Sequence, residues 1–248
     1  MSHEDEVGVI FEEINNIGVI TLNRPKALNA LNYNMLIDLH PRLLEWEKSK
    51  NLVIIKGAGK SFCSGGDLKE VTGSGVEHFA TVEYNINFMI GNYKIPYIAL
   101  LDGAAMGGGL GVSVHGRYRI ATENTVVAMP ETKIGLIPDV GGTYFLPRLP
   151  HNIGFYLALT SNKLRAEDAV TAGIATHFVL SRDLSELQTQ LSKCITDADI
   201  KQVLSRFHTT PKISTLTPYL NNIAYCFDGD SIEEIITRLE QLNNYWSK

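Results

Sequence analysis

Two carboxylates, Glu131 and Asp139, lie in the otherwise apolar segment AMPETKIGLIPDVGG, which spans residues 128–142. Each acid is next to a proline, whose ring fixes the local φ angle. If both acids face one cleft, burial and like-charge repulsion raise the pKa of at least one of them. Such a pair can divide into a proton donor and a base or nucleophile. The alternative role for each acid is a helix cap or a salt-bridge partner.

Two glycine-rich turns could supply the other half of an acyl-transfer site. The turns SGGD (64–67) and GGGL (107–110) each precede a candidate helix, and the first N–H groups of a helix have no partner within it. Two such turns brought together could bind a carbonyl oxygen from both sides, as an oxyanion hole does. The alternative reason for the glycines is close packing of a helix.

Three other motifs do not support a site. The segment KGAGKSF (56–62) lacks the first glycine of a phosphate-binding loop, and GGGLG lacks the spacing of a dinucleotide fingerprint. In GVSVHG (111–116) the second glycine comes one position too late for a nucleophile elbow. We therefore expect Ser113 and His115 to be structural rather than catalytic.

The composition is that of an ordinary globular chain. It has 248 residues, 44% of them hydrophobic, and a formal net charge of -5, which argues against a nucleic-acid partner. Its basic residues are scattered, so no anionic membrane surface is expected as a partner either. The three cysteines are far apart and show no zinc spacing, so we expect reduced thiols. The acidic start, MSHEDEVGVIFEE, shows no import signal.

The elements that must position the acids and the turns alternate between strand and helix. Apolar residues recur at helical spacing from Leu31 to Trp46, with Pro41 expected to kink or split that helix. This alternation predicts an α/β layered domain over residues 1–180, followed by a helical region over 181–248. The predicted strands cover residues 17–22, 52–57, 95–103, 117–122, 125–129 and 175–179.

Three longer segments together resemble the crotonase, or enoyl-CoA hydratase/isomerase, superfamily. They are CSGGDLKEV, the run from AAMGGGLG to YFLPRL, and LTSNKLRAEDAVTAGIATHFV. The resemblance extends from about residue 9 to residue 240, and its branch is that of the 3-hydroxyisobutyryl-CoA hydrolases. It implies a spiral of ββα units with a helical C-terminal region, which is shorter here than in that branch.

The resemblance also implies a chemistry and a substrate. An acyl-CoA thioester would be hydrolysed to the free hydroxy acid and CoA, without a cofactor or a metal, in valine breakdown in the mitochondrial matrix. The acyl group would be 3-hydroxyisobutyryl and also 3-hydroxypropionyl. The thioester oxygen would be bound by the N–H groups of Gly66 and Gly108, with Glu131 and Asp139 as the catalytic acids. Glu83 would bind the substrate; its alternative role is an exposed helix charge.

The branch depends on side chains near the second glycine turn. Hydratases of this superfamily have a catalytic glutamate two residues after the triple glycine, where this chain has Gly111. Gly111 argues against hydration or isomerisation, which is the alternative activity, and a non-catalytic acyl-CoA binder is the alternative class. Lys26 matches the region that meets the CoA phosphates, and the loop 62–68 matches the adenine-binding segment. The loop residues concerned are Ser64, Gly65, Asp67 and Leu68. Superfamily members are often oligomers.

Overall fold

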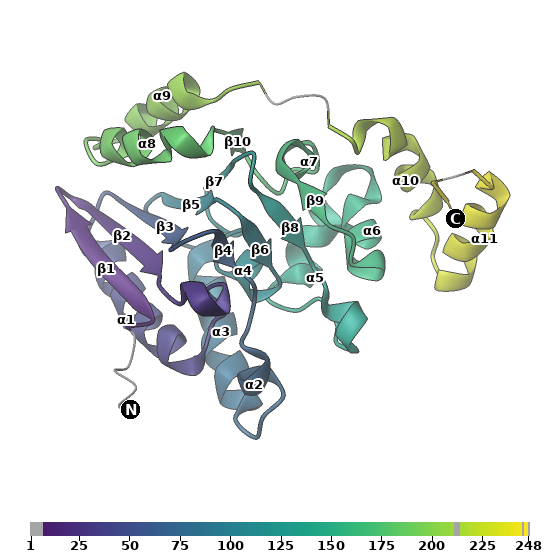
Figure 1. Ribbon diagram of the computed structural model, residues 1–248, viewed down its shortest axis with the longest axis horizontal. Helices are drawn as coiled ribbons and strands as arrows, with labels where there is room; N and C mark the ends of the chain where they lie inside the picture. Colours follow the sequence, from purple (N-terminus) through teal and green to yellow (C-terminus); the bar gives the residue numbers. More distant parts are fainter. Residues whose placement is uncertain (1–6, 211–213, 245, 248) are drawn as a thin grey trace.

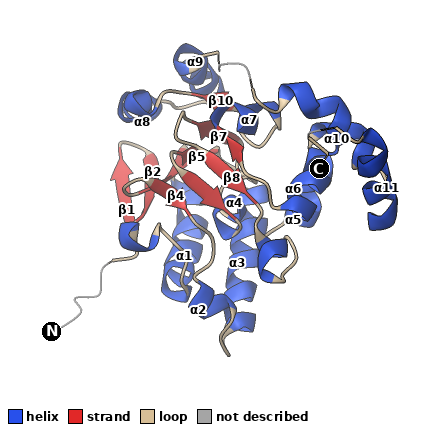
Figure 2. Ribbon diagram, turned by 45° about the vertical axis from the view of Figure 1, so that its right-hand side comes forward, coloured by secondary structure: helices blue, strands red, loops and turns tan. Residues whose placement is uncertain are grey.

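The computed structural model describes residues 7–210, 214–244 and 246–247. Residues 1–6 lie outside the described residues. The expectation that the acidic start carries no import signal therefore stays a prediction. Ten strands form two sheets in the described part of the chain (Figures 1 and 2). The strands are β1 Val9–Ile14, β2 Ile17–Leu22, β3 Leu52–Gly57, β4 Ser61–Cys63, β5 Tyr97–Leu101, β6 Ala104–Met106, β7 Tyr118–Ala121, β8 Val126–Ala128, β9 Leu164–Arg165 and β10 His177–Phe178.

After β1 and β2, which both belong to the larger sheet, each successive pair of strands contributes one strand to each sheet. The six-stranded sheet has the order β1-β2-β3-β5-β7-β10, and the four-stranded sheet has the order β4-β6-β8-β9. Thus β3, β5 and β7 are parallel neighbours in one sheet, while β4, β6 and β8 are parallel neighbours in the other. This alternation confirms the repeating ββα arrangement that the resemblance implies.

Helices follow the strand pairs and then dominate the C-terminal part. The α-helices are α1 Tyr33–Ser49, α2 Leu68–Val71, α3 Val76–Gly91, α4 Gly108–Gly111, α5 Gly142–Phe145, α6 Ile153–Thr160, α7 Ala166–Thr171, α8 Leu184–Leu191, α9 Asp197–Phe207, α10 Leu220–Cys226 and α11 Ile232–Leu242. In Figure 1, α10 and α11 lie at one end of the molecule, away from β1 and β2. No helix among the described residues is long and apolar enough to cross a membrane.

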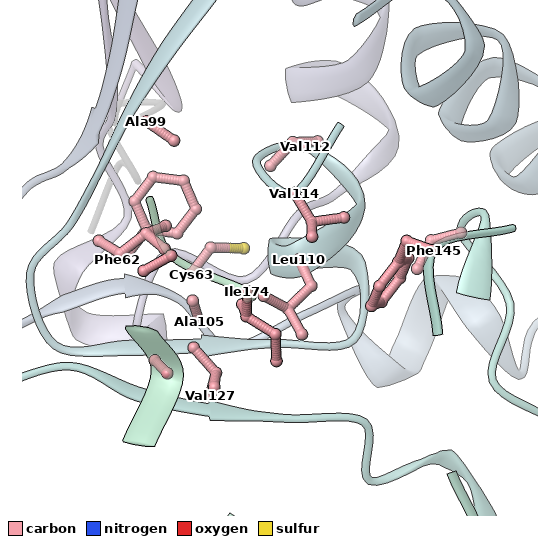
Figure 3. Packing of buried hydrophobic residues seen from close by; sticks show 14 of the residues in the cluster. Phe62, Cys63, Ala99, Ala105, Leu110, Val112, Val114, Val127, Phe145 and Ile174 are labelled. Atoms are coloured by element: carbon pink, nitrogen blue, oxygen red, sulfur yellow. The ribbon is translucent and has the colours of Figure 1, made fainter. Parts of the chain in front are cut away.

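The strands β2, β3 and β5 of the six-stranded sheet are largely buried and nearly continuously apolar, which is typical of strands covered on both faces. In β3, Val53 and Ile55 belong to one hydrophobic cluster, while Leu52 and Ile54 belong to another that includes α8 and α9. The first cluster continues beneath the second glycine turn. There Leu110 of α4 lies near side chains of β4, β6 and β8 (Figure 3). The packing of Leu110 in this cluster thereby holds the short helix α4 in place.

The prediction that Pro41 splits the first helix is wrong, because α1 runs unbroken from Tyr33 to Ser49, while a kink at Pro41 stays a prediction. Pro41 is exposed, so the carbonyl that loses its backbone donor lies on the solvent side. The opposite side is a buried stripe that holds both halves of the helix against the core. Its residues are Met35, Leu36, Leu39, Leu43 and Trp46.

Candidate active site

The two glycine turns meet at one edge of the four-stranded sheet. They follow β4 and β6, which are parallel neighbours, so the turns come off at the same end. A β-carbon at Gly108 would lie 3.2 Å from the backbone nitrogen of Gly66, and one at Gly65 would lie 3.1 Å from the carbonyl oxygen of Met106. Only glycine allows the turns to approach so closely without displacing a neighbour.

The N–H groups of Gly66 and Gly108 have no acceptor among the hydrogen bonds of the described residues. Gly108 is the first residue of α4, where a helix has no internal acceptor to offer. Gly66 precedes Asp67, the residue that caps α2. Two free donors side by side can stabilise the negative charge that develops on a carbonyl oxygen.

Glu131 reaches the same place from the next strand. It begins the 3-10 helix Glu131–Ile134 just after β8, the parallel neighbour of β6. Its Oε1 is 2.7 Å from the position that a β-carbon of Gly107 would occupy, and its buried Oε2 has no hydrogen-bond partner in the described structure. The pKa of Glu131 is raised to about 7, mainly by burial and in smaller part by nearby Asp139, against the lowering effect of a hydrogen bond from its own backbone N–H.

Glu83 is buried against the second glycine turn. It lies on α3 and is 3% exposed, and its Oε1, which has no hydrogen-bond partner among the described residues, contacts the position of a Gly108 β-carbon. Burial, with added repulsion from Asp139 and Glu131, raises the pKa of Glu83 to about 8. The alternative role of Glu83 as an exposed charge on the helix surface is therefore wrong. At neutral pH this carboxyl is protonated and can donate a hydrogen bond.

Asp139 lies across the cavity in the loop between Ile134 and α5. The hydroxyl of Tyr84 donates a hydrogen bond of 2.9 Å to its Oδ2. The ring of His115 holds the same loop through a 2.9 Å bond between its Nε2 and the Val140 carbonyl oxygen. No motif in the sequence indicates a role for Tyr84, although it adjoins Glu83.

A cavity of ≈ 710 Å³ connects these groups. Gly66, Gly108, Glu83, Glu131 and Asp139 all line it. So do four residues expected to bind CoA, namely Ser64, Gly65, Asp67 and Leu68. Lys26 is not among the lining residues, although its neighbour Ala27 is. The structure thus brings together every predicted site residue except Lys26, which lies on the 3-10 helix Pro25–Ala27 beside the cavity.

Arg24 fixes the first glycine turn, a role that the sequence did not indicate. Its Nη1 and Nη2 are both 3.1 Å from Oδ2 of Asp67, and Nη1 also donates to the Ala30 carbonyl at 2.6 Å. The other carboxylate oxygen of Asp67 accepts the N–H of Lys69 at 3.2 Å. The Asp67 side chain therefore holds the loop, and its contribution to ligand binding would come from the backbone.

Glu83→Gln is expected to have a higher free energy of unfolding than the parent chain at high pH. The folded pKa of about 8 exceeds the ordinary value of 4.5 for a glutamate, so the folded state binds more protons than the unfolded state between these pH values. Stability is highest below about pH 4.5 and falls as Glu83 ionises through pH 8. The variant does not lose this stability, so at pH 9 its free energy of unfolding should exceed that of the parent by on the order of a few kcal/mol. Urea unfolding at pH 5, 7 and 9 measures the difference.

Glu77→Gln is the matched control for this measurement, because Glu77 is exposed on the same helix. It should follow the parent chain at every pH. A constant offset between Glu83→Gln and the parent from pH 5 to pH 9 would contradict the assignment of a raised pKa to Glu83.

The arrangement can polarise a carbonyl group and attack it. Two N–H donors face the cavity, and a carboxylate with a pKa near neutrality lies beside them. These are the parts that hydrolysis of an ester or thioester requires. Among the described residues, no group of three or more His, Cys, Asp or Glu side chains could hold a metal ion.

Comparison with known proteins agrees with this geometry. The family model of enoyl-CoA hydratase/isomerase matches residues 17–248. The mitochondrial 3-hydroxyisobutyryl-CoA hydrolase of Xenopus tropicalis is 50% identical over 238 residues, which cover 90% of this chain and 62% of that protein. The enzyme of the same name from Homo sapiens is 46% identical over 249 residues, with 94% and 64% covered. The chain thus spans less than two thirds of the length of these two relatives.

A solved structure shares the fold closely. The carnitinyl-CoA dehydratase from Mycobacterium thermoresistibile superposes with a TM-score of 0.88 and 35% identity, covering 97% of this chain and 72% of that one. The enoyl-CoA hydratase from Rhodobacter sphaeroides gives a TM-score of 0.85 at the same identity. The crotonase-like fold expected from the motifs is confirmed, while the domain boundary at residue 180 stays a prediction. The chain belongs to the enoyl-CoA hydratase/isomerase family.

Proposed function

We propose that this chain is an acyl-CoA thioester hydrolase that converts 3-hydroxyisobutyryl-CoA to the free hydroxy acid and CoA. One observation carries the proposal: Glu131 lies next to the turn that holds the N–H of Gly108, and its buried Oε2 has no hydrogen-bond partner among the described residues. The names of the relatives supply the acyl group. They also support the proposal of a mitochondrial location and a place in valine degradation. 3-Hydroxypropionyl-CoA is proposed as a second substrate.

The carbonyl oxygen of the thioester binds between the N–H groups of Gly66 and Gly108. As the carbonyl carbon becomes tetrahedral, its oxygen gains negative charge, which these donors stabilise. The neighbouring Glu83 is neutral at pH 7, because its pKa is about 8, so it does not repel the oxyanion. Collapse of the intermediate breaks the C–S bond and releases the CoA thiolate. No cofactor or metal is needed for these steps.

Two routes lead to the tetrahedral intermediate. In one, Glu131 attacks the carbonyl carbon and forms an acyl-enzyme anhydride, which water then hydrolyses. In the other, Glu131 removes a proton from water, which attacks directly. Asp139, held by Tyr84 at 2.9 Å, positions the water or the acyl group. A single turnover in ¹⁸O-labelled water distinguishes the routes, since label enters the Glu131 carboxyl only through the anhydride.

Hydration of an enoyl-CoA fits the site less well. Gly111 lacks the second acid, and a β-carbon there would lie 2.7 Å from Cβ of Val140 and 3.0 Å from Nδ2 of Asn87. The space of a hydratase glutamate is therefore filled by these two side chains. The site keeps one acid beside the oxyanion position and excludes a second one at residue 111.

The test is CoA release from 3-hydroxyisobutyryl-CoA, followed with a thiol reagent. We expect turnover of this substrate and no loss of the enoyl absorbance of crotonyl-CoA. Strong hydration of crotonyl-CoA without thioester cleavage would overturn the proposal. A folded chain that binds the substrate without releasing CoA would instead be a non-catalytic acyl-CoA binder.

A further inference from the structure

A second hollow of ≈ 650 Å³ adjoins the active-site cavity. The two share Tyr84, Ile137, Asp139 and Val140, so the hydrogen-bonded pair Tyr84 and Asp139 lies between them. Asn87 lines this second hollow. The hollow therefore begins where an acyl group would continue beyond the thioester carbonyl.

The side-chain amide of Asn87 is buried and makes no hydrogen bond within the part of the chain that the structure describes. It is 5% exposed, and neither its Oδ1 nor its Nδ2 has a hydrogen-bond partner among the described residues. Its buried neighbours on the same helix include Phe79, Ile86 and Ile90, which are apolar. Leaving such a group unpaired costs about 1–3 kcal/mol. An amide kept at this cost suggests a ligand that supplies both a donor and an acceptor.

Asn87 continues the line of polar groups that begins at Glu83. The two residues are one helical turn apart on α3, so they share a face and lie about 6 Å apart along the axis. Each faces a glycine of α4. Glu83 contacts the position of a Gly108 β-carbon, and Nδ2 of Asn87 is 3.0 Å from that of Gly111. The path from the oxyanion position along α4 therefore leads directly to the Asn87 amide.

We propose that Asn87 binds the 3-hydroxyl group of the substrate, which makes it the specificity-determining residue of the acyl pocket. This inference rests on the proposed function, since it takes a hydroxyacyl thioester as the ligand. The amide Nδ2 donates to the hydroxyl oxygen, and the hydroxyl hydrogen is donated to Oδ1. An acyl group without the hydroxyl leaves both amide atoms unpaired, and the site rejects it for that reason.

The test measures binding rather than turnover. Two CoA analogues are used in which a methylene group replaces the thioester sulfur, so the carbonyl remains and cannot be hydrolysed as a thioester. One carries the 3-hydroxyisobutyryl group and the other the isobutyryl group. We expect this chain to bind the hydroxyl analogue about 10–100-fold more tightly. Asn87→Leu should abolish that preference while keeping the affinity for the isobutyryl analogue.

Asn85→Leu is the matched control, because Asn85 is exposed on the same helix and should keep the preference. Asn87→Ala serves as a smaller replacement if the leucine variant does not fold. A folded Asn87 variant that keeps the hydroxyl preference overturns the inference, as does equal binding of both analogues by the parent chain. A clear preference without CoA release from the true thioester would instead contradict the proposed function and leave the inference standing.

Discussion

Replacing Glu131 with glutamine is expected to lower the turnover of 3-hydroxyisobutyryl-CoA by about 10²–10⁴-fold, the usual contribution of a positioned base. Glutamine has nearly the same shape, so packing around residue 131 is kept, but the amide neither attacks a carbonyl nor accepts a proton from water. Steady-state CoA release by the two chains measures the effect. KM should change little, because the carboxylate acts in the transition state rather than in holding the substrate.

Glu12→Gln is the control for the loss of a negative charge, since Glu12 is exposed on β1 and does not line the cavity. Circular dichroism and thermal unfolding show whether each chain is folded. A folded Glu131→Gln chain that retains more than about a tenth of the parent turnover would exclude both the anhydride and the general-base route.

The raised pKa of Glu131 gives the same residue a pH signature. Its pKa of about 7 means that a substantial share is protonated at neutral pH, and only the carboxylate can act. Turnover should therefore increase with pH through about 7. Glu83, with a pKa of about 8, ionises later. Burial is the main cause of both raised pKa values, and repulsion from Asp139 and Glu131 adds to it at Glu83.

Local patterns in the sequence were sufficient to predict the two glycine turns and the apolar wall of the site. Glycines at 66 and 108 indicated turns with free N–H groups, and the apolar run around Glu131 indicated a pocket wall. What the sequence could not give was the strand register. That β4 and β6 are parallel neighbours, which brings Gly66 within reach of Gly108, depends on long-range pairing. The family resemblance, rather than the spacing of residues, supplied this juxtaposition in advance.

The polar residues of α3 show a different limit. A helix with several polar residues usually turns them to solvent. The sequence pattern therefore allowed an exposed charge at Glu83 and indicated no role for Asn87. Their spacing of one turn was the available signal. Only the structure shows that this face packs against the glycines of α4, which leave room for the acid and the amide. Arg24 was missed likewise, since its partner Asp67 is distant in sequence.

Gly108→Ala keeps the backbone N–H but blocks access to it, so turnover is expected to fall by about 10²–10³-fold, the usual effect when one oxyanion donor no longer reaches the carbonyl oxygen. The added methyl group would lie 3.2 Å from the nitrogen of Gly66 and would contact Oε1 of Glu83. It therefore occupies the space between the two N–H donors that the carbonyl oxygen needs. Alanine suits a helix better than glycine does, so the fold should survive the change while the carbonyl site is blocked.

Gly75→Ala is the matched control, because a β-carbon there would have no neighbour within 4 Å and the residue has φ -94°. It should keep full turnover. The measurement for both variants is CoA release at saturating substrate, with unfolding midpoints recorded alongside. If the Gly108→Ala chain is folded and turns over within tenfold of the parent, the carbonyl oxygen does not bind between Gly66 and Gly108. Glu131 would then have to act on a substrate held elsewhere in the cavity.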